Sequence, residues 1–454
     1  MITFKQNFYE NNQTIKQSNN QSLKLLGILF FLLASCRSEP DFSDEPVDIL
    51  AEVEVSYKVS QDLAKEIALG FFATDSSYIA GRKIKSSPKI KDIARVALSD
   101  TLDFEAFVIN ELEGFVMISG DSRVMPILAY SSEGELTAKN LQDVNGLKVW
   151  YQETMLQIDQ ELKGIEEVHP IVYNEWKKYT EKYDPNGRIW DNAVAYNPNS
   201  NCYEWYQYGQ FMCNPYMTVS QRKPLYSYDP SDPLSIGVKW GQSGISNHMA
   251  PTNLFHDCGC NDRSPIGCGG VAIAQTLWYF KPGSANAYNL MPQTSNSPCA
   301  PATSGQISLA LLMYNSALAA NTDFNFGTTC NGMTLPGRIS PALKSMGLQN
   351  GGNSSNFNPS TLKNELAQGY PAIFYGRDSL LEWHIWTSDG YKTHNYKAYD
   401  CDLDGCMEWS YTWYFMNWGW NGSQNGWFSS GVFAPYGSGG SNYNNSLKMI
   451  TGIR

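Results

Sequence analysis

The segment "SPIGCGGVAIAQTLWYF", residues 264–280, constrains the fold of this chain more than any other feature. From residue 268 onward its side chains are apolar on nearly every face of a helix, among them Val271, Ile273 and Leu277. A helix without a polar face is stable only when other elements surround it. We therefore predict a helix over residues 268–280 at the centre of a domain.

Cys268 stands at the start of this helix, between glycines. The free N–H groups and the positive dipole end of a first helical turn stabilise a thiolate. Gly267 and Gly269 allow a close backbone approach and a sharp turn into the helix. The position suits a cysteine nucleophile, although a disulfide partner or a structural thiol remain alternatives.

A thiolate nucleophile needs a histidine nearby, and the chain has five histidines. His384 lies in "LEWHIWTSDGY", where apolar and polar residues alternate, so we predict a strand that ends at an Asp389-Gly390 turn. A second strand is predicted at "GYPAIFYG", residues 369–376. A histidine on a core strand can be held at a fixed distance from a helix start. The alternative is a structural core histidine.

Two further segments offer supporting polar groups. Asn417 lies between aromatic residues in "WYFMNWGWNGSQNGWF", and Gln242 lies in "VKWGQSG". An Asn side chain can orient an imidazolium, and a Gln amide can donate to an oxyanion. Each signal is weak when taken alone.

Together and in this order, the segments resemble the streptopain family of papain-like cysteine peptidases over most of residues 57–454. The likeness rests on "GCGGVAIAQ", on His384 followed by Asp-Gly-Tyr, on "NWGWNG", on the upstream "WGQ" and on "GSGGSNYNNSLKMITGI". The segment "NELEGFVMISGDSRVMPILAYSSEGEL" is similar to the family's inhibitory prodomain.

This resemblance implies an α+β fold in which a helical part carries the nucleophile and an antiparallel sheet part carries the histidine, preceded by an α+β prodomain. It implies that Cys268 is the nucleophile and His384 the base. Gln242 and the Cys268 backbone N–H would bind the oxyanion, and Asn417 and Trp418 would orient the histidine.

Three features depart from the family pattern. Trp383 and Ile385 replace small neighbours of the histidine, which puts the substrate-binding wall in doubt. The long interval between His384 and Asn417 implies a longer hairpin, whose "YDCDLDGCMEW" resembles half of a calcium loop. The calcium candidates are Asp400, Asp402 and Asp404. The twelfth position is Tyr instead of Glu, so a hairpin tip closed by Cys401–Cys406 is preferred.

The N-terminus has the pattern of an export signal. Lysines precede the apolar run "LLGILFFLLAS", which is too short for a transmembrane helix. The run ends in Leu-Ala-Ser-Cys36, which resembles a bacterial lipobox and predicts lipidation of Cys36; a plain signal peptide or an uncleaved anchor are the alternatives. The predicted organisation is a lipoprotein signal peptide (1–35), a tether (36–56), an inhibitory prodomain (57–185), a linker and activation region (186–235) and a cysteine peptidase domain (236–454).

Nine of the ten cysteines follow residue 200, and an exported chain favours disulfides. Besides Cys36 and Cys268, eight remain, and their connectivity cannot be deduced. Cys202–Cys213 and Cys401–Cys406 are the simplest pairs. A zinc site at Cys258-Gly259-Cys260 is the rival interpretation, although that spacing is tight for zinc.

The net charge of −11 and the absence of a basic run argue against nucleic-acid binding. We expect an exported cysteine endopeptidase made as a zymogen, without a cofactor. Its partners would be protein or peptide substrates, the prodomain in cis, and a membrane through the lipid on Cys36. It would be anchored to the bacterial cell envelope, at the outer membrane or cell surface, or released after maturation. The alternatives are a catalytically silent surface lipoprotein on the same fold, or a glycan-binding protein with exposed aromatic platforms.

Overall fold

The structure is a computed structural model. It describes residues 56–75, 78–79, 87–99, 102–143, 145–166, 168–180, 216–232, 234–235, 237–326, 330–377, 383–400, 405–435 and 447–454. All the described residues lie within one compact unit, Val55–Arg454. The predicted signal peptide and Cys36 lie outside the described residues. Within them, no helix is long and apolar enough to cross a membrane.

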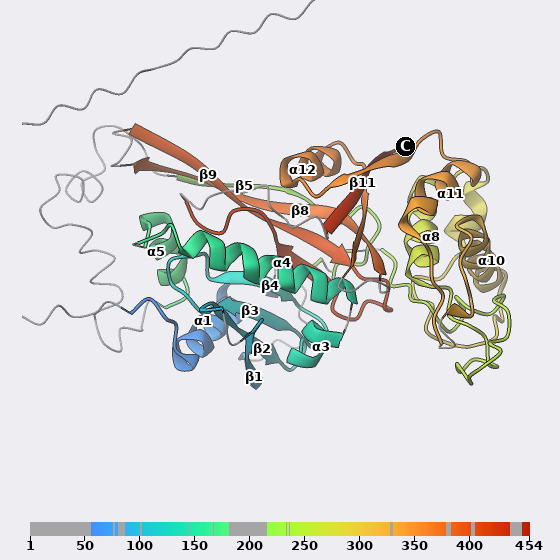
Figure 1. Ribbon diagram of the computed structural model, residues 1–454, viewed down its shortest axis with the longest axis horizontal. Coiled ribbons are helices and arrows are strands. Elements are labelled where there is room, and N and C mark those ends of the chain that lie inside the picture. Colours follow the sequence, from blue (N-terminus) through green and yellow to red (C-terminus); the bar gives the residue numbers. More distant parts are fainter. Residues whose placement is uncertain are drawn as a thin grey trace, which may run out of the picture. The chain divides into compact units, whose positions relative to one another are not determined.

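The first part of the described chain is an antiparallel meander with helices around it (Figure 1). Helix α1 forms because Leu63, Ile67 and Phe71 recur on one buried face, and the Ser60 side chain accepts the N–H of Leu63 as a cap. The elements are α1 (Gln61–Thr74), β1 (Ile90–Ala97), β2 (Glu105–Glu111), β3 (Phe115–Ser119), β4 (Ile127–Ser131), α3 (Ala138–Asp143), α4 (Asn145–Leu162) and α5 (Pro170–Lys177).

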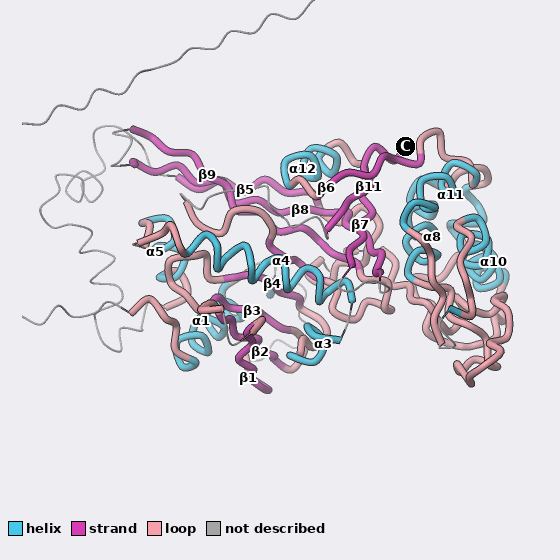
Figure 2. Tube along the Cα trace, in the orientation of Figure 1, coloured by secondary structure: helices cyan, strands magenta, loops and turns pink. Residues whose placement is uncertain are grey.

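The second part combines a group of helices with long strands (Figure 2). Its elements are β5 (Tyr216–Arg222), α8 (Cys268–Phe280), α9 (Ala285–Asn289), α10 (Ser304–Ala319), the 3-10 helix η2 (Pro336–Arg338), α11 (Ile339–Ser345), β6 (Gly351–Asn356), α12 (Pro359–Ala367), β7 (Ala372–Arg377), β8 (Trp383–Asp400), β9 (Gly405–Asn417), β10 (Gly426–Ser429) and β11 (Leu447–Ile453).

One sheet runs through both parts. In the described residues it has eleven strands, in the order β1-β2-β3-β4-β10-β9-β8-β7-β11-β6, with β5 pairing beside β8. The two parts join where β4 pairs with β10, through Tyr130 opposite Trp427 and Ala129 opposite Phe428. Helix α4 packs on β7, β8 and β11 of the second part (Figure 1). The first part is therefore built into the sheet of the second.

Helix α8 occupies the central position that its composition predicts. The residues from Gly269 to Leu277 are all buried. Helices α10 and α11 pack on α8 from one side and strand β8 packs on it from another. The predicted fold class is confirmed, with Cys268 on a helix of the helical part and His384 on β8 of the antiparallel sheet.

The predicted longer hairpin is formed by β8 and β9, but the predicted Asp389-Gly390 turn is wrong. Strand β8 continues through both residues. Its pairing with β9 skips from Ser388 to Gly390, which makes Asp389 the extra residue of a β-bulge. The bulge turns the Asp389 carboxylate onto the backbone N–H groups of Tyr226 and Ser227. Because these bonds satisfy the carboxylate without a turn, β8 continues as a strand through this position.

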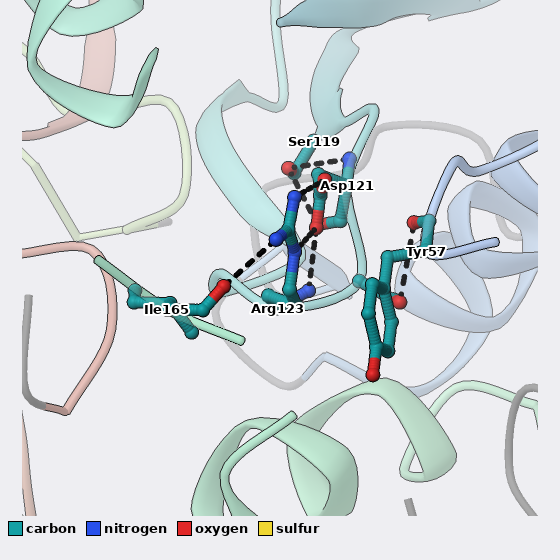
Figure 3. Close-up of polar contacts among 6 residues, drawn as sticks. Tyr57, Ser119, Asp121, Arg123 and Ile165 are labelled. Atoms are coloured by element: carbon teal, nitrogen blue, oxygen red, sulfur yellow. Dashed lines mark hydrogen bonds and ion pairs between the residues drawn. The ribbon is translucent and has the colours of Figure 1, made fainter. Parts of the chain in front are cut away.

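The turn between β3 and β4 joins several distant segments. The Arg123 guanidinium binds both carboxylate oxygens of Asp121 and the carbonyl of Ile165, and it lies 4.9 Å from the centre of the Tyr57 ring (Figure 3). Two residues later, the N–H of Met125 donates to a carbonyl of the second part, at 2.9 Å. Because the Arg123 guanidinium binds several groups at once in a fixed geometry, it fixes the shape of the turn.

Candidate active site

Cys268 begins α8 after a glycine that the geometry requires. Gly267 has a φ of 82°, and a side chain there would meet the carbonyl oxygen of Gly332 at 2.1 Å. The Cys268 sulfur lies beside three backbone N–H groups, those of Cys268, Gly269 and Ile385. Ile385 follows His384 directly, so the helix start and the histidine strand meet at this sulfur.

The Cys268 thiol is not activated in this structure. The residue keeps part of its surface exposed, but its sulfur is surrounded closely enough for desolvation to raise the thiol pKa to about 11. The three N–H groups favour the thiolate and lower the pKa by less than burial raises it. The sequence-based expectation of a stabilised thiolate is therefore not met in this covered state.

His384 is buried on β8 and held by aromatic rings and one carbonyl. Its Nε2 lies 3.1 Å from the Trp418 carbonyl oxygen, which can only accept, so Nε2 carries the proton. The ring lies 4.8 Å from that of Trp420 and stacks at 5.9 Å on that of Trp386. Burial lowers the His384 pKa to about 4, against the opposing effect of the Trp418 carbonyl. The imidazole is therefore neutral near pH 7.

The start of α4 lies directly against this imidazole. A Cβ atom on Gly146 would stand 2.3 Å from Cδ2 of His384. One turn further along α4, Val149 packs on Gly376, which pairs with His384 across β7 and β8: a Cβ atom on Gly376 would stand 2.6 Å from Cγ1 of Val149. The first part of the chain thus covers the histidine, and this cover accounts for part of its desolvation.

The hydrogen bonds of the Asn417 side chain go to residues other than His384. Its Nδ2 donates to Ser227 Oγ at 2.9 Å, and its Oδ1 accepts from Gly419 N–H at 3.1 Å and from Gln275 Nε2 at 3.3 Å. Of the two predicted orienting residues, Trp418 contacts the histidine, through its backbone carbonyl. Asn417 instead holds the turn that contains this carbonyl.

Gln242 lies beside the start of α8. Its backbone carbonyl accepts the N–H of Ile266, two residues before Cys268, at 2.9 Å. In the described part of the chain, its half-buried side-chain amide makes no hydrogen bond. Close by, the Asn421 N–H donates to the Trp240 carbonyl, which ties this segment to the loop after Trp418. The backbone of Gln242 is therefore held next to the residues that lead into α8.

The other cysteines with described side chains form disulfides. Cys258 pairs with Cys330 and Cys260 with Cys299, with Cα atoms 5.3 and 5.0 Å apart. These bonds use both cysteines of the candidate zinc site, so the zinc interpretation is wrong. Among the described residues, no cluster of three or more His, Cys, Asp or Glu could hold a metal ion.

Several predicted features lie outside the described residues. They are Asp402, Asp404, the side chain of Asp400, the predicted pair Cys202–Cys213, and, of the predicted pair Cys401–Cys406, Cys401 and the side chain of Cys406.

Sequence reasoning missed three residues that shape the site. Asp389 belongs to a quoted motif, but nothing in the sequence shows that its carboxylate binds the Tyr226 and Ser227 N–H groups. Burial raises the pKa of Asp389 to about 6. Ser227 lies within a segment that looks like linker. Gly146 has no local signal, because its role depends on a ring that lies 238 positions later in the chain.

The fold and the site define a class of protein. A papain-like α+β part carries a cysteine at a helix start and a histidine on a neighbouring strand, and an N-terminal part covers the histidine. Residues 282–428 match the model of the Peptidase C10 family, the streptopain family. Residues 56–158 match the model of the Spi protease inhibitor family. The resemblance stated from the sequence is confirmed.

The peptidase match includes His384, Asn417 and Trp418 and begins after Cys268 and Gln242. Among solved structures, a fragment of prointerpain A from Prevotella intermedia, a cysteine-to-alanine mutant, is 15% identical with a TM-score of 0.44. The similarity covers 80% of this chain and 98% of that fragment. The comparison with curated proteins finds no match.

Proposed function

We propose that this chain is an exported cysteine endopeptidase, made as a zymogen, in which Cys268 and His384 hydrolyse peptide bonds of proteins. One observation carries the proposal above the others. The Cys268 sulfur sits at a helix start against the N–H of Ile385, and the neighbouring His384 lies under Gly146 of an inhibitor-like N-terminal part. The peptidase and inhibitor family matches occur in the order that a zymogen requires.

Removal of the N-terminal part would return water to both groups. The pKa of His384 would then rise from about 4 and that of Cys268 would fall from about 11, because burial is the main cause of both shifts. With its Nε2 proton held on the Trp418 carbonyl, His384 has Nδ1 free to take the thiol proton. The resulting thiolate–imidazolium pair is the reactive form of such a site.

The thiolate then attacks a peptide carbonyl carbon, and its oxygen becomes an oxyanion. The side-chain amide of Gln242 and the backbone N–H of Cys268 donate to that oxyanion. His384 gives its proton to the leaving amine, and water cleaves the acyl-enzyme with His384 as base. Loss of one oxyanion donor costs about 2.7–4 kcal/mol of transition-state stabilisation.

Export and anchoring form a separate part of the proposal. The signal pattern and the Leu-Ala-Ser-Cys36 sequence support cleavage before Cys36 and lipidation of its thiol, which would place the peptidase on the bacterial cell envelope. Incorporation of labelled palmitate, and its loss in Cys36→Ser, are the expected results. An unlabelled wild-type protein that is wholly released from cells would contradict anchoring.

Activity assays test the catalytic proposal. Cys268→Ala and His384→Ala should each abolish casein hydrolysis after the linker is cut, while His248→Ala should leave it unchanged. His248 is a suitable control because its Nδ1 contacts the carbonyl of Cys299, in the disulfide-linked segment. Activity that survives in Cys268→Ala would refute the peptidase. A wild-type protein that stays inactive and unreactive towards iodoacetamide after the prodomain is degraded would favour the silent alternative.

The glycan-binding alternative finds less support in the packing. In the described part of the chain, Phe255 is the one aromatic residue whose side chain is exposed. Five tryptophans, Trp150, Trp176, Trp240, Trp386 and Trp418, are fully buried. A platform that stacks on sugars would require aromatic rings, such as those of tryptophan, exposed on the surface.

A further inference from the structure

A buried chain of hydrogen bonds begins at the bulge of β8. Asp389, the extra residue of that bulge, is fully buried. Its Oδ2 accepts the N–H of Tyr226 at 2.8 Å and the N–H of Ser227 at 2.7 Å, and its backbone carbonyl accepts the N–H of Leu225. β-Bulges beside active sites redirect single side chains in this way. The carboxylate therefore pins the segment 225–227 onto the sheet.

The chain of hydrogen bonds continues through two side chains that are also buried. Ser227 Oγ accepts from Asn417 Nδ2, and Asn417 Oδ1 accepts from Gly419 N–H. These bonds fix the turn from residue 417 to residue 419 at both ends. Within that turn, the Trp418 carbonyl accepts the proton of His384 Nε2.

We propose that Asp389 and Ser227 are positioning residues that set the orientation of His384 by fixing Asn417 and the Trp418 carbonyl. The proposal rests on the proposed function, in which His384 is the base. Neither residue touches the reacting atoms. Asp389 lies five residues beyond His384 on the same strand, so it acts through Ser227 and the 417–419 turn.

Because this network is buried, the loss of any one of its hydrogen bonds should displace the side chains that it holds. The side chains of Asp389, Ser227 and Asn417 are each at most 1% exposed. Without the Ser227 hydroxyl, the Nδ2 of Asn417 would be left buried without its partner, which is costly enough to rotate the amide or shift the turn. A displacement of about 1 Å at a catalytic group can cost about a hundredfold in rate.

The proposal also assigns a role to the segment after the linker. Strand β5 pairs with β8 from Tyr216 to Arg222, and the residues 225–227 continue from it to Asp389. This segment precedes the predicted peptidase domain in the sequence, yet it completes the support of the histidine. A peptidase that begins at residue 236 would lack Ser227.

The test compares Ser227→Ala with Ser227→Thr, which keeps the hydroxyl. Ser220→Ala on β5 is the matched control, because the Ser220 hydroxyl contacts Asn395 and not Asn417. All are made in the full chain and assayed after the linker is cut, with the rate expressed per reactive Cys268. Ser227→Ala should lower kcat about 10- to 100-fold with KM within about twofold. Ser227→Thr and Ser220→Ala should stay within about threefold of wild type.

A second readout separates this proposal from the proposed function. The rate of iodoacetamide alkylation of Cys268 is measured against pH without any substrate. Ser227→Ala should shift the acidic limb of this pH profile, because a misplaced His384 no longer pairs with the thiolate. Asp389→Asn should shift the same limb in the same direction. If the wild type hydrolyses no peptide, the proposed function fails while this profile still decides the positioning role. Equal profiles for wild type and Ser227→Ala, or an equal defect in Ser227→Thr, would overturn it.

Discussion

The contact between Gly146 and His384 predicts that one methyl group would weaken latency. In Gly146→Ala the new Cβ would lie 2.3 Å from His384 Cδ2, whereas ordinary contacts begin at 3.4 Å. The two groups must therefore separate by about 1 Å. The imidazole has little room to move, because Trp420 and Trp386 flank it and the Trp418 carbonyl holds Nε2.

The start of α4 must therefore move away from the sheet. Overpacking of this kind costs about 1–3 kcal/mol. Every 1.4 kcal/mol changes an equilibrium about tenfold, so the uncovered fraction should rise roughly 5- to 150-fold. The assay is the alkylation rate of Cys268 in the uncut chain at pH 7, together with hydrolysis of a fluorogenic peptide.

Gly164→Ala is the matched control in the same part of the chain. A Cβ there would meet its nearest neighbour, the Glu161 carbonyl oxygen, at 3.7 Å, which is ordinary contact. This variant should alkylate at the wild-type rate. If Gly146→Ala alkylates no faster than Gly164→Ala while both retain the wild-type circular dichroism spectrum, α4 does not control access to the site.

Three further measurements test other parts of the structure. In the uncut protein, the alkylation rate of Cys268 should rise about tenfold per pH unit up to a midpoint near the thiol pKa of about 11, because only the thiolate reacts. Removal of the prodomain should move that midpoint to lower pH; a midpoint near 9 in the uncut protein would contradict the burial argument. Replacing Cys258 and Cys330 by serine removes a disulfide that spans a sequence separation of 72. In the chain-entropy model this should lower the free energy of unfolding, measured in urea, by about 4 kcal/mol. A loss below about 1 kcal/mol would contradict that model for this disulfide. Arg123→Lys cannot reproduce the paired bonds to Asp121 and should destabilise by about 1–3 kcal/mol in thermal unfolding, whereas Arg95→Lys, on an exposed ion pair, should change stability by less than about 0.5 kcal/mol. Equal effects of the two arginine variants would refute the special role of the turn.

The features that the sequence predicts well are local or come from the family motifs. The largely apolar helix α8 follows from thirteen consecutive residues, and the placement of His384 on a strand follows from alternation over eleven. The continuous sheet has no such signal. It depends on two residue pairs between β4 and β10, which lie about 300 positions apart in the chain. No periodicity within either strand identifies its partner.

The Asp389-Gly390 pair shows a different limit. Asp-Gly is a strong turn signal, because glycine tolerates turn geometry and aspartate binds nearby backbone N–H groups. Here the same preference is met by tertiary contacts, since the carboxylate accepts the N–H groups of Tyr226 and Ser227 from a distant segment. The residue type therefore predicts that the Asp389 carboxylate binds backbone N–H groups, but it does not predict where in the chain those groups lie.

The state of Cys268 depends on two effects of which the sequence shows only one. The helix start and the neighbouring N–H groups are encoded next to the cysteine, and they favour the thiolate. Burial opposes them and prevails, and part of the cover over the neighbouring His384 comes from α4, which precedes Cys268 by more than a hundred residues. Removing that cover eliminates its share of the desolvation but leaves the N–H groups in place. Under the proposed function, the same cysteine is therefore an inert thiol in the uncut chain and a nucleophile after cleavage, without any change in its own helix.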